Sequence, residues 1–234
     1  MAVKLRKAPS KPKAAECAQA HQVLVYTHDT VASLLDAFAD IRKARNAVGT
    51  PTDEEQDLLR AMLVFASAGL DSVAKQLIKD CLLALVEASP EVRIAFERFV
   101  EKRVRGRVDD EGVSGGLDAR FVAAALLAPD TTGHLVNHLA ADLTAGSLQS
   151  VEELKKVAVF LAASPKKIDA TPGELRAAFD ARNQIIHEMD IDFSIKNRNR
   201  FSRTKDAMVK NTNALLDVTR DLLAAVDDCL SASS

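Results

Sequence analysis

Three polar side chains stand close together late in the chain, within the segment ARNQIIHE at residues 181–188. Arg182 and Asn183 are adjacent, and His187 follows four residues after Asn183. Histidine titrates near neutral pH and can move a proton, while the planar guanidinium of arginine matches the geometry of phosphoryl oxygens. These side-chain types are suited to acid–base chemistry beside a bound anion. Taken without further context, a structural role is the favoured interpretation, because helix surfaces often carry such residues.

A helical conformation would limit how these three residues can meet. At about 100° per residue, Asn183 and His187 lie about 40° apart and share a face. Arg182 and His187 lie about 140° apart and cannot converge on one small ligand from a single straight helix. A site that uses both is easier to assemble when a second copy of the helix faces the first across a two-fold axis, which favours a homodimer.

The elements that position these residues are predicted to be helices, so the fold class is all-α. Glycine and proline are scarce, at 9 and 7 residues, aromatic residues make up 4%, and no alternating strand pattern or internal repeat is present. Capping pairs or a proline in the first turn mark several helix starts. Gly69 interrupts the longest apolar stripe and permits a close helix crossing. The predicted helices cover about 23–47, 53–87, 89–105, 117–128, 131–144, 150–163, 171–188 and 204–230, and residues 106–116 form a glycine-rich loop.

The motif resembles the signature of the HEPN domains (higher eukaryotes and prokaryotes nucleotide-binding). That signature is an arginine, four to six residues and a histidine, most typically with asparagine directly after the arginine. The segment LLRAMLVFASAGLDSVAKQLI at 58–78 also looks like the long second helix of the group, and a final helix follows the motif. The resemblance covers about residues 20–88 and 150–230. It implies a HEPN-like helical bundle in a single domain, 20–232, with residues 89–149 as an inserted helical elaboration. Composition, with its Lys and Pro residues, predicts a basic, disordered leader at residues 1–19.

The resemblance also implies an activity. HEPN members that are enzymes are metal-independent endoribonucleases, and their composite site lies at a homodimer interface. Carried over to this chain, Arg182 and His187 are the catalytic pair and Asn183 is the accompanying polar residue. The expected products are a 2′,3′-cyclic phosphate and a 5′-hydroxyl, with no cofactor and no metal. The alternative is a non-catalytic module that binds RNA, nucleotide or a partner protein, including a nucleotidyltransferase antitoxin.

The family resemblance further suggests a biological setting. Many prokaryotic members serve toxin–antitoxin or antiviral-defence systems, so we expect a toxin or defence effector. An unrestrained ribonuclease harms its own host, and an inhibitory antitoxin or another regulatory partner is therefore expected as well.

A run of cations follows the motif and contains no acid from residue 193 to residue 205. Because it begins just after His187, it is predicted to hold the RNA backbone, and Phe201 within it offers a stacking surface. A solvated basic loop is an equally good interpretation. The acids between the histidine and the loop allow two further interpretations: they repel phosphate, or they pair with the arginines of the loop and order it. The candidate RNA-binding residues are Lys196, Arg198, Arg200, Arg203 and Lys205, and the acids are Glu188, Asp190 and Asp192.

Two further polar features lie outside the motif. Asp71 is an acid in the middle of a mostly apolar helix, and we expect it either to pair with Arg182 and orient it or to lie exposed at the helix edge. His134 and His138 are one helical turn apart, but no third ligand stands at a matching offset, so no metal site is predicted.

Composition limits the remaining possibilities. The 31 basic and 33 acidic residues give a net charge of −2, so any contact with nucleic acid must come from local patches. The longest uncharged apolar stretch, residues 61–70, is about half a membrane span, and no transmembrane helix or secretory signal is expected. The three cysteines are far apart and show no metal-ligand spacing, which favours a reducing compartment, the cytoplasm.

Overall fold

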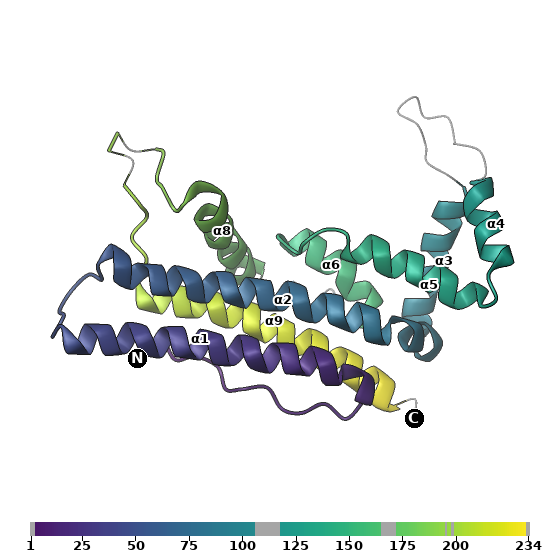
Figure 1. Ribbon diagram of the computed structural model, residues 1–234, viewed down its shortest axis with the longest axis horizontal. Coiled ribbons are helices and arrows are strands. Elements are labelled where there is room, and N and C mark those ends of the chain that lie inside the picture. The colour runs from purple at the N-terminus through teal and green to yellow at the C-terminus, as the bar shows by residue number, and fades with distance from the viewer. Residues whose placement is uncertain (1–2, 106–117, 165–171, 195, 198, 233–234) are drawn as a thin grey trace.

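The computed structural model describes residues 3–105, 118–164, 172–194, 196–197 and 199–232. Over these residues the chain is all-helical, as predicted, with eight α-helices, one 3-10 helix and no β-strand (Figure 1). The predicted loop at 106–116 lies outside the described residues. The helices are η1 (Ala15–Cys17), α1 (Ala18–Ala44), α2 (Asp53–Ala88), α3 (Pro90–Val104), α4 (Ala119–Leu127), α5 (Thr131–Thr144), α6 (Val151–Phe160), α8 (Pro172–Glu188) and α9 (Lys205–Ala232).

Side-chain caps begin three of the helices where the sequence predicts a start, at Thr52, Ser89 and Ser150. The Thr52 hydroxyl accepts a hydrogen bond from the Glu55 N–H, and the Glu55 carboxylate accepts one from the Thr52 N–H, at 3.4 Å and 2.9 Å. This reciprocal pair satisfies amides that the first turn of α2 leaves free. The Ser89 hydroxyl likewise accepts from the Val92 N–H at 3.3 Å and starts α3. Thr171, the first residue of the predicted helix 171–188, lies outside the described residues.

Helix α2 is the centre of the bundle. It lies beside α1 and α9, and α8 packs on α2 and α9, while α3 to α6 gather toward the C-terminal end of α2 (Figure 1). One contiguous apolar core joins these helices, with the exception of α4. The close crossing predicted at Gly69 is confirmed, because a Cβ atom there would lie 2.2 Å from Cγ2 of Thr27 on α1.

The composition of α2 also resembles that of a membrane span. Its most apolar window of 18 residues has a mean hydropathy of 1.3, and it is the one described helix long and apolar enough for such a span. Within that window, 56% of the residues are buried inside the protein, as in the core helix of a bundle.

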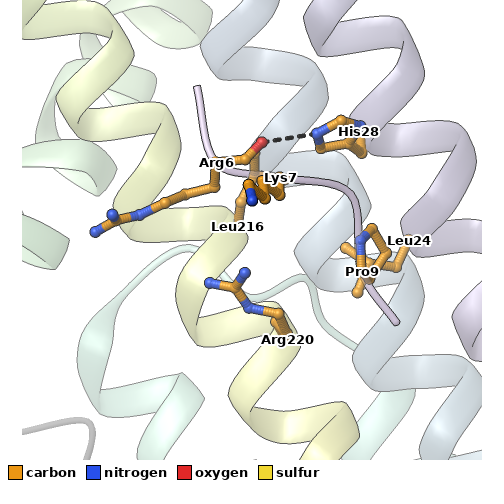
Figure 2. Close-up of a pocket in the computed structure, with 7 residues that line it drawn as sticks. All are labelled: Arg6, Lys7, Pro9, Leu24, His28, Leu216 and Arg220. Atoms are coloured by element: carbon orange, nitrogen blue, oxygen red, sulfur yellow. Dashed lines mark hydrogen bonds between the residues drawn. The ribbon is translucent and has the colours of Figure 1, made fainter. Parts of the chain in front are cut away.

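The described part of the leader, residues 3–14, is attached to the bundle. The Asn213 side chain accepts a hydrogen bond from the Arg6 N–H at 2.9 Å, and Asp227 accepts from the N–H groups of residues 13 and 14. The His28 ring lies 2.9 Å from the Arg6 carbonyl oxygen (Figure 2). This arrangement differs from the disordered leader that the composition predicts, because side chains on α1 and α9 satisfy the backbone of the segment.

Candidate functional site

Arg182 lies on the inner face of α8, which packs against α2, α6 and α9. Its side chain is half-buried, and its Nε atom has neither solvent contact nor a hydrogen-bond partner among the described residues. Burial lowers the pKa of the Arg182 guanidinium, and the negative charge of Asp71 opposes that effect. Arginine starts from so high a pKa that the group stays a cation at neutral pH.

Asn183 connects Arg182 to a neighbouring loop. Nη1 of Arg182 donates to Oδ1 of Asn183 at 3.0 Å, and Nδ2 of Asn183 lies 3.5 Å from the carbonyl oxygen of Gln149. Gln149 belongs to the connection between α5 and α6. The two adjacent motif residues therefore form a unit that rests on this connection.

Asp71 holds the same connection from the side of α2. Its carboxylate accepts a hydrogen bond from the Leu148 N–H at 2.8 Å and pairs with Lys75 at 2.8 Å. Within the described residues no hydrogen bond joins Asp71 to Arg182, although its charge acts on the guanidinium. Asp71 therefore pairs with Lys75 in place of the predicted partner Arg182, and Asp71 and Asn183 contact the α5–α6 connection at adjacent residues, Leu148 and Gln149.

His187 lies on a different face of α8 from Arg182. It is exposed in the last turn of α8, and its ring makes no hydrogen bond or ion pair in the part of the chain that the structure describes. Arg182 faces inward, as the angle of about 140° between the two positions requires. A single protomer therefore brings together Arg182, Asn183 and Asp71, while His187, one turn after Asn183, lies on a different face of α8 from Arg182.

The five cations after the motif have different environments. Lys196 is exposed and Lys205 is half-buried, and neither has an ion-pair partner within the described residues. Arg198 lies outside the described residues. The ring of Phe201, a predicted stacking surface, lies 5.4 Å below the guanidinium of Arg203.

Arg203 is part of a buried ion-pair network centred on Asp190. The Asp190 side chain is fully buried, and its Oδ2 atom accepts from Nε of Arg60 at 2.7 Å. Arg203 donates to both carboxylate oxygens and also to Oε1 of Gln184 on α8. Asp190 therefore pairs with one arginine of the loop, Arg203, as the second interpretation of these acids expects.

Arg200 also has an acidic partner, in an ion pair at the protein surface. Its Nη2 atom lies 2.7 Å from Oδ1 of Asp57, the carboxylate that Arg60 contacts at 2.9 Å. Burial alone would raise the pKa of Asp57, but the hydrogen bonds from Arg200 and Arg60 outweigh it and lower that pKa. Two of the predicted RNA-binding cations, Arg200 and Arg203, therefore neutralise acids of the bundle, and an RNA backbone would have to displace those partners.

Arg60 is the residue that sequence reasoning misses. It lies on α2 between residues of an apolar stripe, and nothing in its neighbourhood marks it as the partner of an acid 130 residues away. Gln149 is missed for the same reason, because its contribution to the site is a backbone carbonyl oxygen.

The two histidines of α5 pack on each other. The ring centroids of His134 and His138 are 4.8 Å apart, and His138 also meets Phe121 edge-on at 5.3 Å. No group of three or more metal-ligating side chains assembles in the described ranges. A groove of about 1620 Å³ runs along α9 between the leader and the start of α8, and none of its lining residues belongs to the motif.

Comparison with known proteins gives no match among protein-family models, among curated proteins or among solved structures.

Proposed function

We propose that this chain is a metal-independent endoribonuclease of the HEPN type. The observation that best supports the proposal is the arrangement of the motif on α8. Arg182 is held by Asn183 through one nitrogen, while its Nη2 is neither buried nor hydrogen-bonded in the described structure. A cation with a spare donor can bind a phosphoryl oxygen, and the exposed imidazole of His187 can exchange protons with a substrate.

The proposed reaction needs no metal. His187 removes the proton from the 2′-hydroxyl of the RNA, and the 2′-oxygen attacks the adjacent phosphorus. The bond from phosphorus to the 5′-oxygen breaks, and the leaving oxygen takes up a proton. Arg182 stabilises the charge that develops on the phosphoryl oxygens. The products are a 2′,3′-cyclic phosphate and a 5′-hydroxyl.

The complete site is proposed to need two copies of the chain. Arg182 and His187 lie on different faces of α8, so one copy does not present both groups to the same phosphate. A two-fold axis that brings two α8 helices together would place the arginine of one copy beside the histidine of the other. We further propose a cytoplasmic toxin or antiviral-defence setting, with an inhibitory partner, because that is what the HEPN resemblance implies.

Cleavage of labelled RNA in EDTA tests the activity. We expect the wild-type protein to release cyclic-phosphate ends and both His187→Ala and Arg182→Ala to be inactive. Arg176→Ala is the matched control, since Arg176 is an exposed arginine on the same helix. Cleavage by His187→Ala at the wild-type rate would refute the proposal, as would cleavage that disappears in EDTA.

Mixing the two inactive variants tests the composite site. In a heterodimer of Arg182→Ala and His187→Ala, one of the two sites keeps both groups if each site draws on both copies. Random exchange of subunits makes half of the dimers mixed, so about a quarter of the wild-type activity should return. No recovery, with subunit exchange verified by native mass spectrometry, would show that each site lies within one copy.

A second candidate function is a non-catalytic module that binds RNA, nucleotide or a partner protein. The observation that favours it is that Arg200 and Arg203 both form ion pairs with acids of the protein, which leaves fewer free cations beside the motif. Binding of RNA or a partner without cleavage, by both wild type and His187→Ala, would support this alternative.

A further inference from the structure

The chain reverses sharply just after His187. Met189 and Asp190 both adopt left-handed backbone conformations, with φ of 53° and 60°, and neither is glycine. The Asp190 N–H donates to the Gln184 carbonyl oxygen at 3.0 Å, so this bond closes around the turn that carries His187. Left-handed conformations are costly for residues with a Cβ atom and persist where surrounding contacts hold them.

Those contacts come from the Asp190 side chain and its backbone carbonyl. The carboxylate binds Arg60 of α2 and Arg203 of the α8–α9 connection, and the carbonyl oxygen accepts from the Phe201 N–H at 2.8 Å. Arg203 also reaches back to the side chain of Gln184, one turn before the reversal. The end of α8 is thus tied both to α2 and to the following connection.

His187 has no such anchor of its own. Its ring makes no hydrogen bond within the described structure, so the direction of the imidazole depends on the backbone of the last turn of α8. A proton-transferring group must be held in a defined position relative to the substrate. The contacts that fix residues 184–190 are therefore the ones that can fix His187.

We propose that Asp190 is a positioning residue for His187: its buried carboxylate, held between Arg60 and Arg203, fixes the last turn of α8 and with it the imidazole. The inference rests on the proposed function, in which His187 transfers the proton. It also gives Arg203 a structural part in the site, in place of a direct contact with RNA.

Nuclear magnetic resonance relaxation tests the positioning without any need for activity. Asp190→Asn keeps the side-chain shape but removes the charge and turns an amide toward two guanidinium groups. We expect the backbone order parameter at residues 186–189 to fall from about 0.85 to below about 0.6, with broadening of the His187 ring signals. An unchanged order parameter would overturn the proposal.

Glu55 supplies a matched control. Its carboxylate is also buried and lies between two arginines, 2.8 Å from Arg42 and 3.1 Å from Arg45, and neither of these arginines belongs to α8 or the turn after it. Glu55→Gln should leave residues 186–189 rigid, and an equal loss of order there would reduce the effect of Asp190 to general destabilisation. If Asp190→Asn does not fold, Arg203→Ala removes one of the two guanidinium groups that hold the Asp190 carboxylate; unchanged order at residues 186–189 in that variant would overturn the proposal.

Kinetics then connect position with chemistry. For Asp190→Asn we expect kcat to fall about 10- to 100-fold while KM stays within twofold, because the substrate still binds but the group that transfers the proton is misplaced. Glu55→Gln should change neither value by more than about twofold. A rise in KM at unchanged kcat would contradict the proposal. Inactivity of the wild-type protein would refute the proposed ribonuclease, whereas the relaxation result would still decide whether Asp190 fixes the turn.

Discussion

Oδ2 of Asp190 lies 2.7 Å from Nε of Arg60, although 130 residues separate the two in the chain. The Asp190 side chain is 0% exposed and the Arg60 side chain 3%, so the pair joins the end of α8 to α2 inside the protein. Taking two charges out of water costs several kcal/mol each, and the pair is tolerable only because further hydrogen bonds satisfy both groups. Arg60 also donates to the carbonyl oxygen of Phe201 at 2.9 Å, which supplies one of those bonds.

Removal of one partner from this network should be strongly destabilising. We expect Asp190→Ala to lower the free energy of unfolding by about 3–5 kcal/mol, because two guanidinium groups then lose their shared anion. The double variant Asp190→Ala with Arg60→Ala should lose less unfolding free energy than the two single variants lose together. In the double variant, neither member of this pair is left as a buried charge without the other. Urea unfolding measures these values, with the exposed Arg176→Ala expected within about 0.5 kcal/mol of wild type. Strict additivity of the two single changes would contradict the coupling.

Gly69 should resist substitution even by alanine. A Cβ atom would lie 2.2 Å from Cγ2 and 2.8 Å from Cβ of Thr27, so the crossing of α1 and α2 would have to open. Although alanine is the better helix former by about 1 kcal/mol, we expect Gly69→Ala to lower stability by about 1–3 kcal/mol net.

Two further variants control that prediction. Thr27→Gly combined with Gly69→Ala moves the small residue to the other helix and should recover part of the loss in thermal unfolding. Gly146→Ala, where nothing lies within 4 Å of the new Cβ, should be close to neutral. A Gly69→Ala protein as stable as wild type would show that the helices adjust without cost.

Local signals are sufficient to predict most of the helices. The Thr52 and Glu55 pair fixes the start of α2, because its two hydrogen bonds need only residues three apart. The apolar stripe that follows predicts the buried spine, and the crossing at Gly69 follows from the lack of a side chain. The attachment of the leader cannot be predicted in this way. Its contacts with Asn213 and Asp227 join distant parts of the chain, and composition alone does not indicate them.

The candidate site is predictable only in part. The angle between positions on one helix is enough to separate Arg182 from His187, because it depends only on their spacing in the sequence. The basic run, in contrast, allows two interpretations from sequence, since arginines beside acids can bind RNA or pair internally. The choice depends on Asp57 and Arg60. Both lie on α2 beside the α8–α9 connection, but they are far from it in the sequence.

Acid should weaken the start of α2 through Glu55. The Thr52 N–H bonded to its carboxylate, supported by Arg42 and Arg45, lowers the pKa of Glu55 in the folded protein. Because the folded pKa lies below the unfolded one, this stabilisation is complete above the unfolded value of about 4.3 and is lost as the pH falls through the folded pKa. We expect Glu55→Gln to be less stable than wild type at pH 7 and to flatten the fall in unfolding free energy below about pH 4.3. Parallel curves for the two proteins would contradict this assignment.

Salt-dependent RNA binding should separate Lys196 from the paired arginines. Lys196 is exposed and without an ion pair among the described residues, so it is free to contact phosphate if the proposed function holds. In a non-cleaving His187→Ala background, Lys196→Ala should raise the Kd and reduce the slope of log K against log salt by about 0.7 for a single-stranded RNA. Lys79→Ala, at an exposed lysine on α2, should leave both the Kd and the slope unchanged.

Arg203→Ala should act mainly on thermal stability, because its guanidinium binds Asp190. If Arg203→Ala instead removes the dependence of log K on log salt while its stability is unchanged, Arg203 contacts RNA directly.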